Sequence, residues 1–259
     1  MKKVLITGAN GQLGQCLQKI APLYKNLEFT FKNSKDLDIT DTSSIKKTFE
    51  LVDFDYCINC AAYTNVEQAE KTPDIAFKVN AEGVKNLAFA CKKHKVGLIH
   101  ISTDYVFDGE KNEPYTTDDI PNPINEYGKS KLLGEKYIQE IMVDYIIIRT
   151  SWLYSEFGKN FYTSILKKAQ AGENIAVTDQ QIGCPTNANN LVFYILNIIS
   201  NNVKPHGIQH FTDGVTLNWF EFAEQILVDN NLTKNVRLEK VKNYRTFARR
   251  PNYSVLKQE

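Results

Sequence analysis

The sequence has 259 residues, of which 42% are hydrophobic and 24% charged, so it is long enough to bury a large core. Its 31 basic and 30 acidic residues give a formal net charge of +1, which argues against nucleic acid or an anionic membrane as the main partner. No apolar run approaches the roughly 20 residues of a membrane span. The run after Met1 is cut short at Thr7, too early for a signal peptide, so we expect a cytoplasmic protein.

The first 20 residues have a pattern typical of a dinucleotide site. Residues 4–7 form a β-branched and apolar run, as expected for a buried parallel strand. Glycines then recur at every third position, at Gly8, Gly11 and Gly14, and a helical pattern follows. This order favours a tight turn, a close approach of the backbone to a diphosphate, and close packing of the helix at the third glycine. The alternative is a glycine-rich turn that binds nothing.

The second predicted strand, residues 27–31, ends without the acidic residue that a NAD site places there. Lys32, Ser34 and Lys35 follow it, and cations and hydroxyls suit a 2′-phosphate. The pattern therefore favours NADPH, with NADH possible and with lysines that only face water as the alternative. Asp38 and Ile39 come next, where Asp38 can accept from the adenine amino group and Ile39 can pack on its ring.

The third predicted strand, residues 56–59, contains the first cysteine of a CxxC pair, Cys57 and Cys60. Residues three apart on a strand point to opposite faces, and no second CxxC or histidine cluster completes a zinc set. We therefore interpret the five cysteines as buried, reduced thiols. The small residues Ala61 and Ala62 then let the backbone approach a ligand at the strand end.

Strand and helix patterns alternate through the first 150 residues. Pro73 opens a helix that contains the polar Asn80, which either bridges strand ends near the cofactor or lies at the helix surface. Apolar strands follow at residues 96–101 and 144–149. We predict an α/β fold with a Rossmann-type doubly wound parallel sheet and a smaller C-terminal substrate-binding lobe. Residues 1–150 form the NAD(P)-binding domain, and residues 151–259 form mainly the substrate lobe, partly interleaved with the sheet.

Three polar side chains form the candidate catalytic set. Thr103 follows the strand at 96–101, and Tyr127 and Lys131 lie four residues apart in a helical pattern, so they share a helix face. A free tyrosine has a pKa near ~10, which a neighbouring ammonium group should lower. With Thr103 polarising the carbonyl oxygen that Tyr127 protonates, the set suits hydride transfer to a carbonyl. The alternative is an ordinary surface pair beside a strand-end threonine.

The order of glycine motif, hydroxyl and YxxxK resembles the extended short-chain dehydrogenase/reductase family over nearly the whole chain. Within that family the dTDP-4-dehydrorhamnose reductases have similar motifs, here STDYVFDG (102–109), RTSW (149–152), DQQIGCPT (179–186) and RRPNYS (249–254). The resemblance implies NAD(P)H-dependent reduction of the 4-keto group of dTDP-4-dehydro-L-rhamnose. That reaction is the last step of dTDP-L-rhamnose synthesis for bacterial surface polysaccharide, including lipopolysaccharide O-antigen.

The resemblance also implies roles for individual residues. It makes Tyr127 the proton donor, Thr103 its helper and Lys131 the partner of the nicotinamide ribose. The expected cofactor contacts are Gly8, Gly11, Gln12, Leu13, Asp38, Ile39, Ala61, Ala62, Tyr63, Thr64, Tyr127 and Lys131. The expected substrate contacts are Thr103, Asp104, Trp152 and Arg250. Trp152 would offer an apolar face to a deoxysugar, although a lone tryptophan is more often core, and Arg250 would pair with the diphosphate or stay solvated beside Arg249.

The chain departs from the family in two respects. Some members form a magnesium-bridged dimer through glutamates, but this chain has Cys16 and Asn189 at the matching places. We therefore expect no metal site, and a monomer or weak homodimer. The sequence also stops at Glu259, whereas family members usually continue through a C-terminal helical segment. Either the substrate lobe lacks part of its usual cover or the sequence is a piece of a longer chain.

Two other functions remain open from the sequence. One is a reductase or epimerase of a different nucleotide-4-ketosugar, because Trp152 and Arg250 do not determine the base or the sugar stereochemistry. The other is a non-catalytic regulatory subunit of methionine adenosyltransferase, which belongs to the same family and can retain parts of the Thr103, Tyr127 and Lys131 set.

Overall fold

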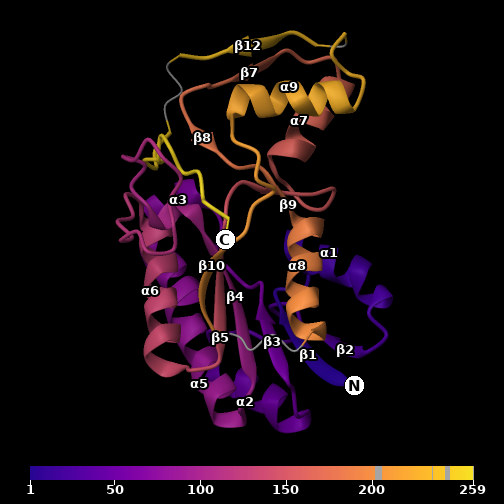
Figure 1. Ribbon diagram of the computed structural model, residues 1–259, viewed down its shortest axis with the longest axis vertical. Coiled ribbons are helices and arrows are strands. Elements are labelled where there is room, and N and C mark those ends of the chain that lie inside the picture. Colours follow the sequence, from indigo (N-terminus) through magenta and orange to yellow (C-terminus); the bar gives the residue numbers. More distant parts are fainter. Residues whose placement is uncertain (202–205, 235, 243–245, 259) are drawn as a thin grey trace.

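The computed structural model describes residues 1–201, 206–234, 236–242 and 246–258, so Glu259 lies outside the described residues. At its centre is a six-stranded sheet with the order β10-β5-β4-β3-β1-β2, in which all neighbours are parallel. The strands are β1 (Lys2–Thr7), β2 (Leu27–Phe31), β3 (Tyr56–Asn59), β4 (Gly97–Thr103), β5 (Tyr145–Thr150) and β10 (His206–His210). The predicted doubly wound parallel sheet is confirmed (Figure 1).

Helices cover both faces of this sheet, as Figure 1 shows. One face packs on α1 (Gln12–Ile20) and α8 (Ala188–Ser200), and the other on α2 (Thr42–Leu51), α5 (Val84–His94) and α6 (Glu126–Ile141). Side chains alternate between the two cores, so that Val4 and Ile6 belong to the first and Leu5 to the second. Short 3₁₀ turns lie at η1 (Ala21–Leu23) and η3 (Asp104–Val106).

The helix predicted from Pro73 is not uniform. It consists of α4 (Pro73–Phe77), a π-helical turn η2 (Lys78–Gly83) and α5, preceded by the short α3 (Val66–Lys71). The prediction of one regular helix is therefore wrong at its middle. The wider turn contains Asn80, which is completely buried and hydrogen-bonded to neighbouring segments.

Most of the remaining C-terminal elements form a separate group at one end of the sheet (Figure 1). They are β6 (Leu153–Tyr154), α7 (Phe161–Gln170), β7 (Ile175–Val177), β8 (Ile182–Gly183), β9 (Thr186–Asn187), β11 (Leu217–Asn218), α9 (Trp219–Asp229) and β12 (Leu238–Lys240). The group has its own core, built around Ile165, Phe222 and Ile226. In contrast, α8 and β10 return to the main sheet, β10 as the neighbour of β5. Within the described residues, no helix has the length and apolar character needed to cross a membrane.

A buried ion pair joins α6 to the sheet. The guanidinium of Arg149 on β5 donates from Nη2 to Glu135 Oε2 at 2.7 Å and from Nε to Oε1 at 3.1 Å. The side chains are 2% and 0% exposed, and Ser102 Oγ on β4 also donates to Glu135. Because both charges are out of water, each depends on the other for compensation.

We predict that Glu135→Gln lowers the free energy of unfolding by about 3–5 kcal/mol, because it leaves the Arg149 charge buried without a counter-ion. Urea unfolding followed by circular dichroism measures this. The matched control is Glu50→Gln, which removes the exposed 3.8 Å pair with Lys46 and should cost about 0–1 kcal/mol. Equal losses in the two variants would contradict the prediction.

Candidate active site

The turn after β1 is the first part of the site. Gly8 has a φ of +64°, a backbone conformation that favours glycine, and a Cβ there would lie 2.6 Å from the Ala61 nitrogen. A Cβ on Gly14 would lie 2.6 Å from the Cα of Ala9, so the helix can pack this closely only with glycine. The tight turn and the close helix packing expected from the glycine spacing are both confirmed.

The beginning of α1 fits a diphosphate. Gly11 is the N-cap, no side chain caps the helix, and its first turn contains no acidic residue. The first N–H groups of a helix have no acceptor within the helix, so this end offers donors and a favourable dipole to an anion. Gly11, Gln12 and Leu13 are the residues that would hold the diphosphate.

Residues 61–64 adjoin this turn and are held by Asn80. Asn80 Oδ1 accepts from the Tyr63 N–H at 2.8 Å, and its Nδ2 donates to the Tyr63 carbonyl and to Ser130 Oγ, both at 3.0 Å. Of the two interpretations of Asn80, the one in which it bridges segments is confirmed. Ala62 and Tyr63 are half-buried and Thr64 is exposed, so this edge is open to a ligand.

The segment after β2 supplies the expected adenosine contacts. The carbonyl of Lys32 accepts from the Ala9 N–H at 3.0 Å, which places Lys32 beside the glycine turn, while Lys35 is exposed. Asp38 is exposed and its Oδ1 accepts from the Thr40 N–H at 2.8 Å. Ile39 is only 3% exposed, and its side chain packs in the core shared with α2 and α5. The side chain therefore mainly anchors this segment to the core.

The Lys131 amine is buried beneath the ends of β3 and β4. It is 2% exposed, and Nζ donates to the Ile101 carbonyl at 2.7 Å and lies 3.1 Å from His100 Nε2. Burial lowers the pKa of Lys131 to about 8, while Glu135 and Cys60 act in the opposite direction.

Tyr127 and Thr103 are brought together, as predicted. Burial raises the pKa of Tyr127 to about 12, a hydrogen bond with the Thr103 side chain lowers it, and the charge of Asp104 raises it. The expectation that Lys131 lowers this pKa is wrong for the described structure, because the amine is directed to Ile101 and His100. Tyr127 is therefore protonated at neutral pH, the state that a proton donor requires.

Asp104 lies at the centre of a hydroxyl cluster. It is 3% exposed, and its carboxylate accepts from Ser254 Oγ at 2.6 Å, Ser151 Oγ at 3.0 Å and Thr103 Oγ1 at 3.0 Å. Burial raises the pKa of Asp104 to about 6, against the hydrogen bonds, which lower it. The carboxylate thus connects the end of β4, the segment after β5 and the C-terminal segment.

Trp152 is half-buried and stacks on Trp219 at the start of α9, with ring centroids 3.5 Å apart and planes 6° from parallel. It has a φ of +46° and adjoins Gly183, where a Cβ would lie 2.5 Å from the indole. The indole is thus held between the main sheet and the C-terminal group by a tight backbone and a second tryptophan.

Arg250 is held by Glu67 on α3 rather than lying solvated beside Arg249. Its Nη2 donates to Glu67 Oε1 at 2.9 Å, and Glu67 Oε2 accepts from the Phe247 N–H at 2.8 Å and the Ala248 N–H at 3.2 Å. Nearby, Asn125 caps α6 by accepting from the Gly128 N–H and donates to the Arg249 carbonyl at 2.9 Å. The segment that contains Arg250 is thus fastened to the beginning of the helix that contains Tyr127.

Ser151, Ser254, Glu67 and Trp219 belong to the site but were not predicted from the sequence. Ser151 and Ser254 lie inside the motifs RTSW and RRPNYS, so each motif did contain a signal. Nothing in the sequence distinguishes Glu67 from the other carboxylates near it, because its partners are about 180 residues away.

Comparisons with known proteins show the family of the chain. The model of the RmlD substrate binding domain matches residues 1–259. The dTDP-4-dehydrorhamnose reductase of Aggregatibacter actinomycetemcomitans is 37% identical, over 99% of this chain and 90% of the relative. The chain belongs to the RmlD family of dTDP-4-dehydrorhamnose reductases.

Two further relatives are a solved structure with bound NADP and a reductase named for a different sugar. The crystal structure of the Bacillus anthracis dTDP-4-dehydrorhamnose reductase in complex with NADP has a TM-score of 0.94 and 37% identity, and covers 100% of this chain and 91% of that one. A dTDP-4-keto-6-deoxy-D-glucose reductase of Streptomyces niveus is 34% identical over 85% of this chain and 75% of the relative. The family thus includes members named for different ketosugars.

Cys16 and Asn189, the two departures noted in the sequence, lie on α1 and α8. Cys16 is buried on α1, and Asn189 on α8 donates from Nδ2 to Glu156 Oε2 at 2.9 Å. Lys19 pairs with the same carboxylate at 2.5 Å. Among the described residues no group of three or more His, Cys, Asp or Glu side chains could hold a metal ion.

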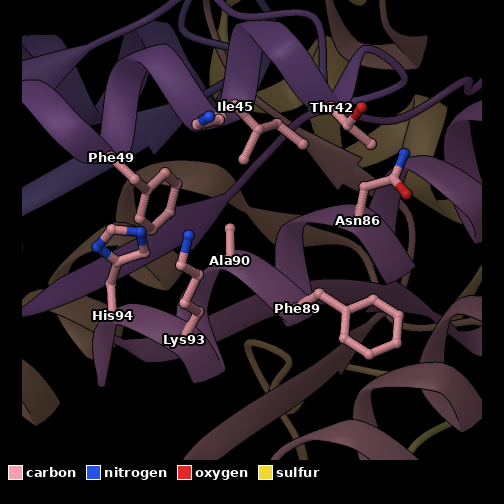
Figure 2. A pocket seen from close by; sticks show the side chains of 9 residues that line it. Thr42, Ile45, Phe49, Asn86, Phe89, Ala90, Lys93 and His94 are labelled. Carbon is pink, nitrogen blue, oxygen red and sulfur yellow. The ribbon is translucent and has the colours of Figure 1, made fainter.

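Two hollows on the described surface can be compared with the expected site. One, between α2 and α5, is lined by Phe49, His94 and Lys93 and contains none of the expected site residues (Figure 2). The other has a volume of about 400 Å³ and is lined by Asp108, Arg249, Arg250 and Asn252 among others. The second hollow therefore lies at Arg250, the residue expected to contact the diphosphate of the sugar nucleotide.

We predict that Asp104 makes stability fall with rising pH. Its folded pKa of about 6 lies above the ordinary 3.8, so between these values the folded protein binds more protons than the unfolded chain. The contribution is greatest below pH 3.8 and is lost as the pH rises through 6. Relative to Asp104→Asn, the parent should lose about 1 kcal/mol between pH 5 and 7, as urea unfolding measures. Parallel pH dependence in both proteins would contradict this.

Proposed function

We propose that the protein reduces the 4-keto group of dTDP-4-dehydro-β-L-rhamnose to dTDP-L-rhamnose with NADPH, the last step of dTDP-rhamnose synthesis for surface polysaccharide. The observation that carries the proposal is the meeting of a protonated Tyr127 with Thr103, one helical turn from the buried Lys131. We place the protein in the cytoplasm as a monomer or weak homodimer. Residues 1–150 hold the cofactor, and residues 151–259 supply mainly sugar-nucleotide recognition.

NADPH supplies the hydride to the carbonyl carbon when it is bound. Without ligand the Thr103 hydroxyl donates to Asp104 Oδ1; with substrate bound it would rotate to donate to the carbonyl oxygen and so favour the negative charge that develops there. Tyr127 gives its phenolic proton to the same oxygen, which becomes the new hydroxyl. Lys131, with Nζ fixed by the Ile101 carbonyl, directs its remaining hydrogen-bonding capacity toward the nicotinamide ribose hydroxyls and the Tyr127 side.

We assign Gly8, Gly11, Gln12 and Leu13 to the diphosphate, and residues 61–64 with Tyr127 and Lys131 to the nicotinamide half. Asp38 would contact the adenine together with the backbone of Ile39, whose side chain is buried in the core. Lys32 and Lys35 would attract the 2′-phosphate, which favours NADPH over NADH. The NADP bound to the Bacillus anthracis relative supports this choice.

The sugar nucleotide would lie across Asp104, Trp152 and Arg250. Trp152 can offer the part of its half-buried indole that Trp219 and Gly183 do not cover to the apolar 6-deoxy side of the sugar. Arg250 would release Glu67 and bind the diphosphate instead, because a guanidinium can form two parallel charge-assisted hydrogen bonds with a phosphate. The Streptomyces niveus relative keeps another 4-ketosugar as the second candidate substrate.

The assay that tests this function follows NADPH oxidation at 340 nm with dTDP-4-dehydro-L-rhamnose. We expect turnover, with a KM for NADPH below that for NADH. The control substrate is dTDP-4-keto-6-deoxy-D-glucose, which lacks the required stereochemistry at the sugar ring. Turnover of the control sugar alone would overturn the proposal in favour of the second candidate.

We predict that Tyr127→Phe lowers kcat by about 10²–10⁴-fold, because it removes the proton donor and keeps the ring. The Kd for NADPH, measured by fluorescence titration, should change less than about twofold. Tyr137→Phe is the matched control: it lies on the same helix, its hydroxyl donates to Glu82 at 3.0 Å, and kcat should stay at the parent value. Equal kcat in parent and Tyr127→Phe would refute the assigned role.

A further inference from the structure

A row of buried polar side chains crosses three neighbouring strands of the main sheet, at the carboxyl ends of β1 and β3. Thr7, Asn59 and His100 are register neighbours on β1, β3 and β4, and each is no more than 1% exposed. On the same face, one pleat earlier, the corresponding positions are the apolar Leu5, Cys57 and Leu98. Polar groups at this depth are costly unless they are hydrogen-bonded, so the directions of their bonds carry information.

The bonds of the row determine the orientation of the Asn59 amide. Thr7 Oγ1 donates to Asn59 Oδ1 at 2.6 Å, and the Ala61 N–H donates to the same oxygen at 3.2 Å. The backbone N–H can only donate, so the atom it faces must be the amide oxygen. Asn59 Nδ2 therefore faces His100 Nδ1, at 3.0 Å, and donates to it.

This orientation selects the tautomer of His100. If Nδ1 accepts from Asn59, a neutral ring carries its hydrogen on Nε2. Burial, and next the charge of Lys131, lower the pKa of His100 well below its usual range, so the ring is neutral. The Nε2–H then points at Lys131 Nζ, 3.1 Å away.

An ammonium group has three donors and no acceptor, whereas a neutral amine has a lone pair. While Lys131 is charged, the His100 N–H faces a group that cannot accept its hydrogen, which is unfavourable. Once Lys131 has given up a proton, the same N–H can donate to the lone pair of Nζ, which is favourable. The other groups that act on the amine are Glu135, one turn along α6, and Cys60 at the end of β3, and both favour the charged form. His100 is the neighbour whose bond is specific for the neutral amine.

We propose that His100, oriented by Asn59, is a positioning residue that prepares Lys131 to give up a proton on the Tyr127 side during turnover. The proposal rests on the proposed reductase function. When Tyr127 protonates the substrate oxygen, the phenolate must recover a proton. The N–H bond of Lys131 breaks to supply it, the electron pair stays on Nζ, and this lone pair accepts from the His100 Nε2–H that already points at it.

Asn59→Asp tests the proposal with almost no change in shape. A carboxylate still accepts from Thr7 and Ala61, but it also accepts from His100 Nδ1–H, so the ring should change tautomer and present a lone pair to Lys131. We expect the alkaline limb of the kcat–pH profile, and the Lys131 pKa followed by NMR of ¹³C-lysine-labelled protein, to rise by about one pKa unit or more.

Asn59→Ala separates the tautomer from the added charge. It also removes the amide donor that makes Nδ1 an acceptor, and it brings no carboxylate. The Lys131 pKa should therefore rise in this variant too. A rise in Asn59→Asp with no rise in Asn59→Ala would show a purely Coulombic effect and overturn the proposal.

The tautomer itself is observable without substrate. Long-range ¹H–¹⁵N spectra of protein labelled at its four histidines distinguish the two neutral forms. We expect the Nε2–H form for His100 in the parent between pH 6 and 9, and the Nδ1–H form in Asn59→Asp. A parent ring that carries hydrogen on Nδ1, or on both nitrogens at pH 7, would overturn the proposal. Absence of turnover in the parent, with these spectra and Lys131 shifts as expected, would instead contradict the reductase function.

Discussion

The geometry of the site depends on how α6 is held against the sheet. Tyr127, Lys131 and Glu135 are spaced by four residues and share one helix face. Glu135 is bound by Arg149 from β5 and Ser102 from β4, and Lys131 by the Ile101 carbonyl. Two anchors a turn apart determine both the rotation and the height of the helix. Tyr127, the first residue on this helix face, is therefore placed beside Thr103.

Polar side-chain bonds also join the C-terminal part of the chain to the sheet around the site. Asp104 holds Ser254, Glu67 holds Arg250, and Gln12 in the first turn of α1 accepts from Asn160, the N-cap of α7, at 2.7 Å. Each bond joins a segment beside the main sheet to one in the C-terminal part of the chain, and the hydrophobic cores of these two parts are separate.

Local patterns predicted the strands and the glycine turn well because their causes are local. Consecutive isoleucines at 146–148 mark a strand buried on both faces, and the positive φ of Gly8 follows from the turn it makes. The π-turn at Asn80 was missed because it arises from a contact with Tyr63 and Ser130, on other segments. The direction of the Tyr127 pKa was missed for a similar reason. Spacing places Lys131 one turn away, but only the fold shows that its amine turns to His100 and that burial dominates.

Burial acts on the two catalytic ionisations in opposite directions, with one consequence for the chemistry. It raises the pKa of Tyr127 to about 12 and lowers that of Lys131 to about 8. A phenolate beside an ammonium group is therefore disfavoured before the ligands bind, and the proton stays on the phenol. In the proposed mechanism, Tyr127 donates its proton when a carbonyl oxygen polarised by Thr103 develops negative charge. The site would then stabilise the transition state more than the bound substrate, which is what raises a rate.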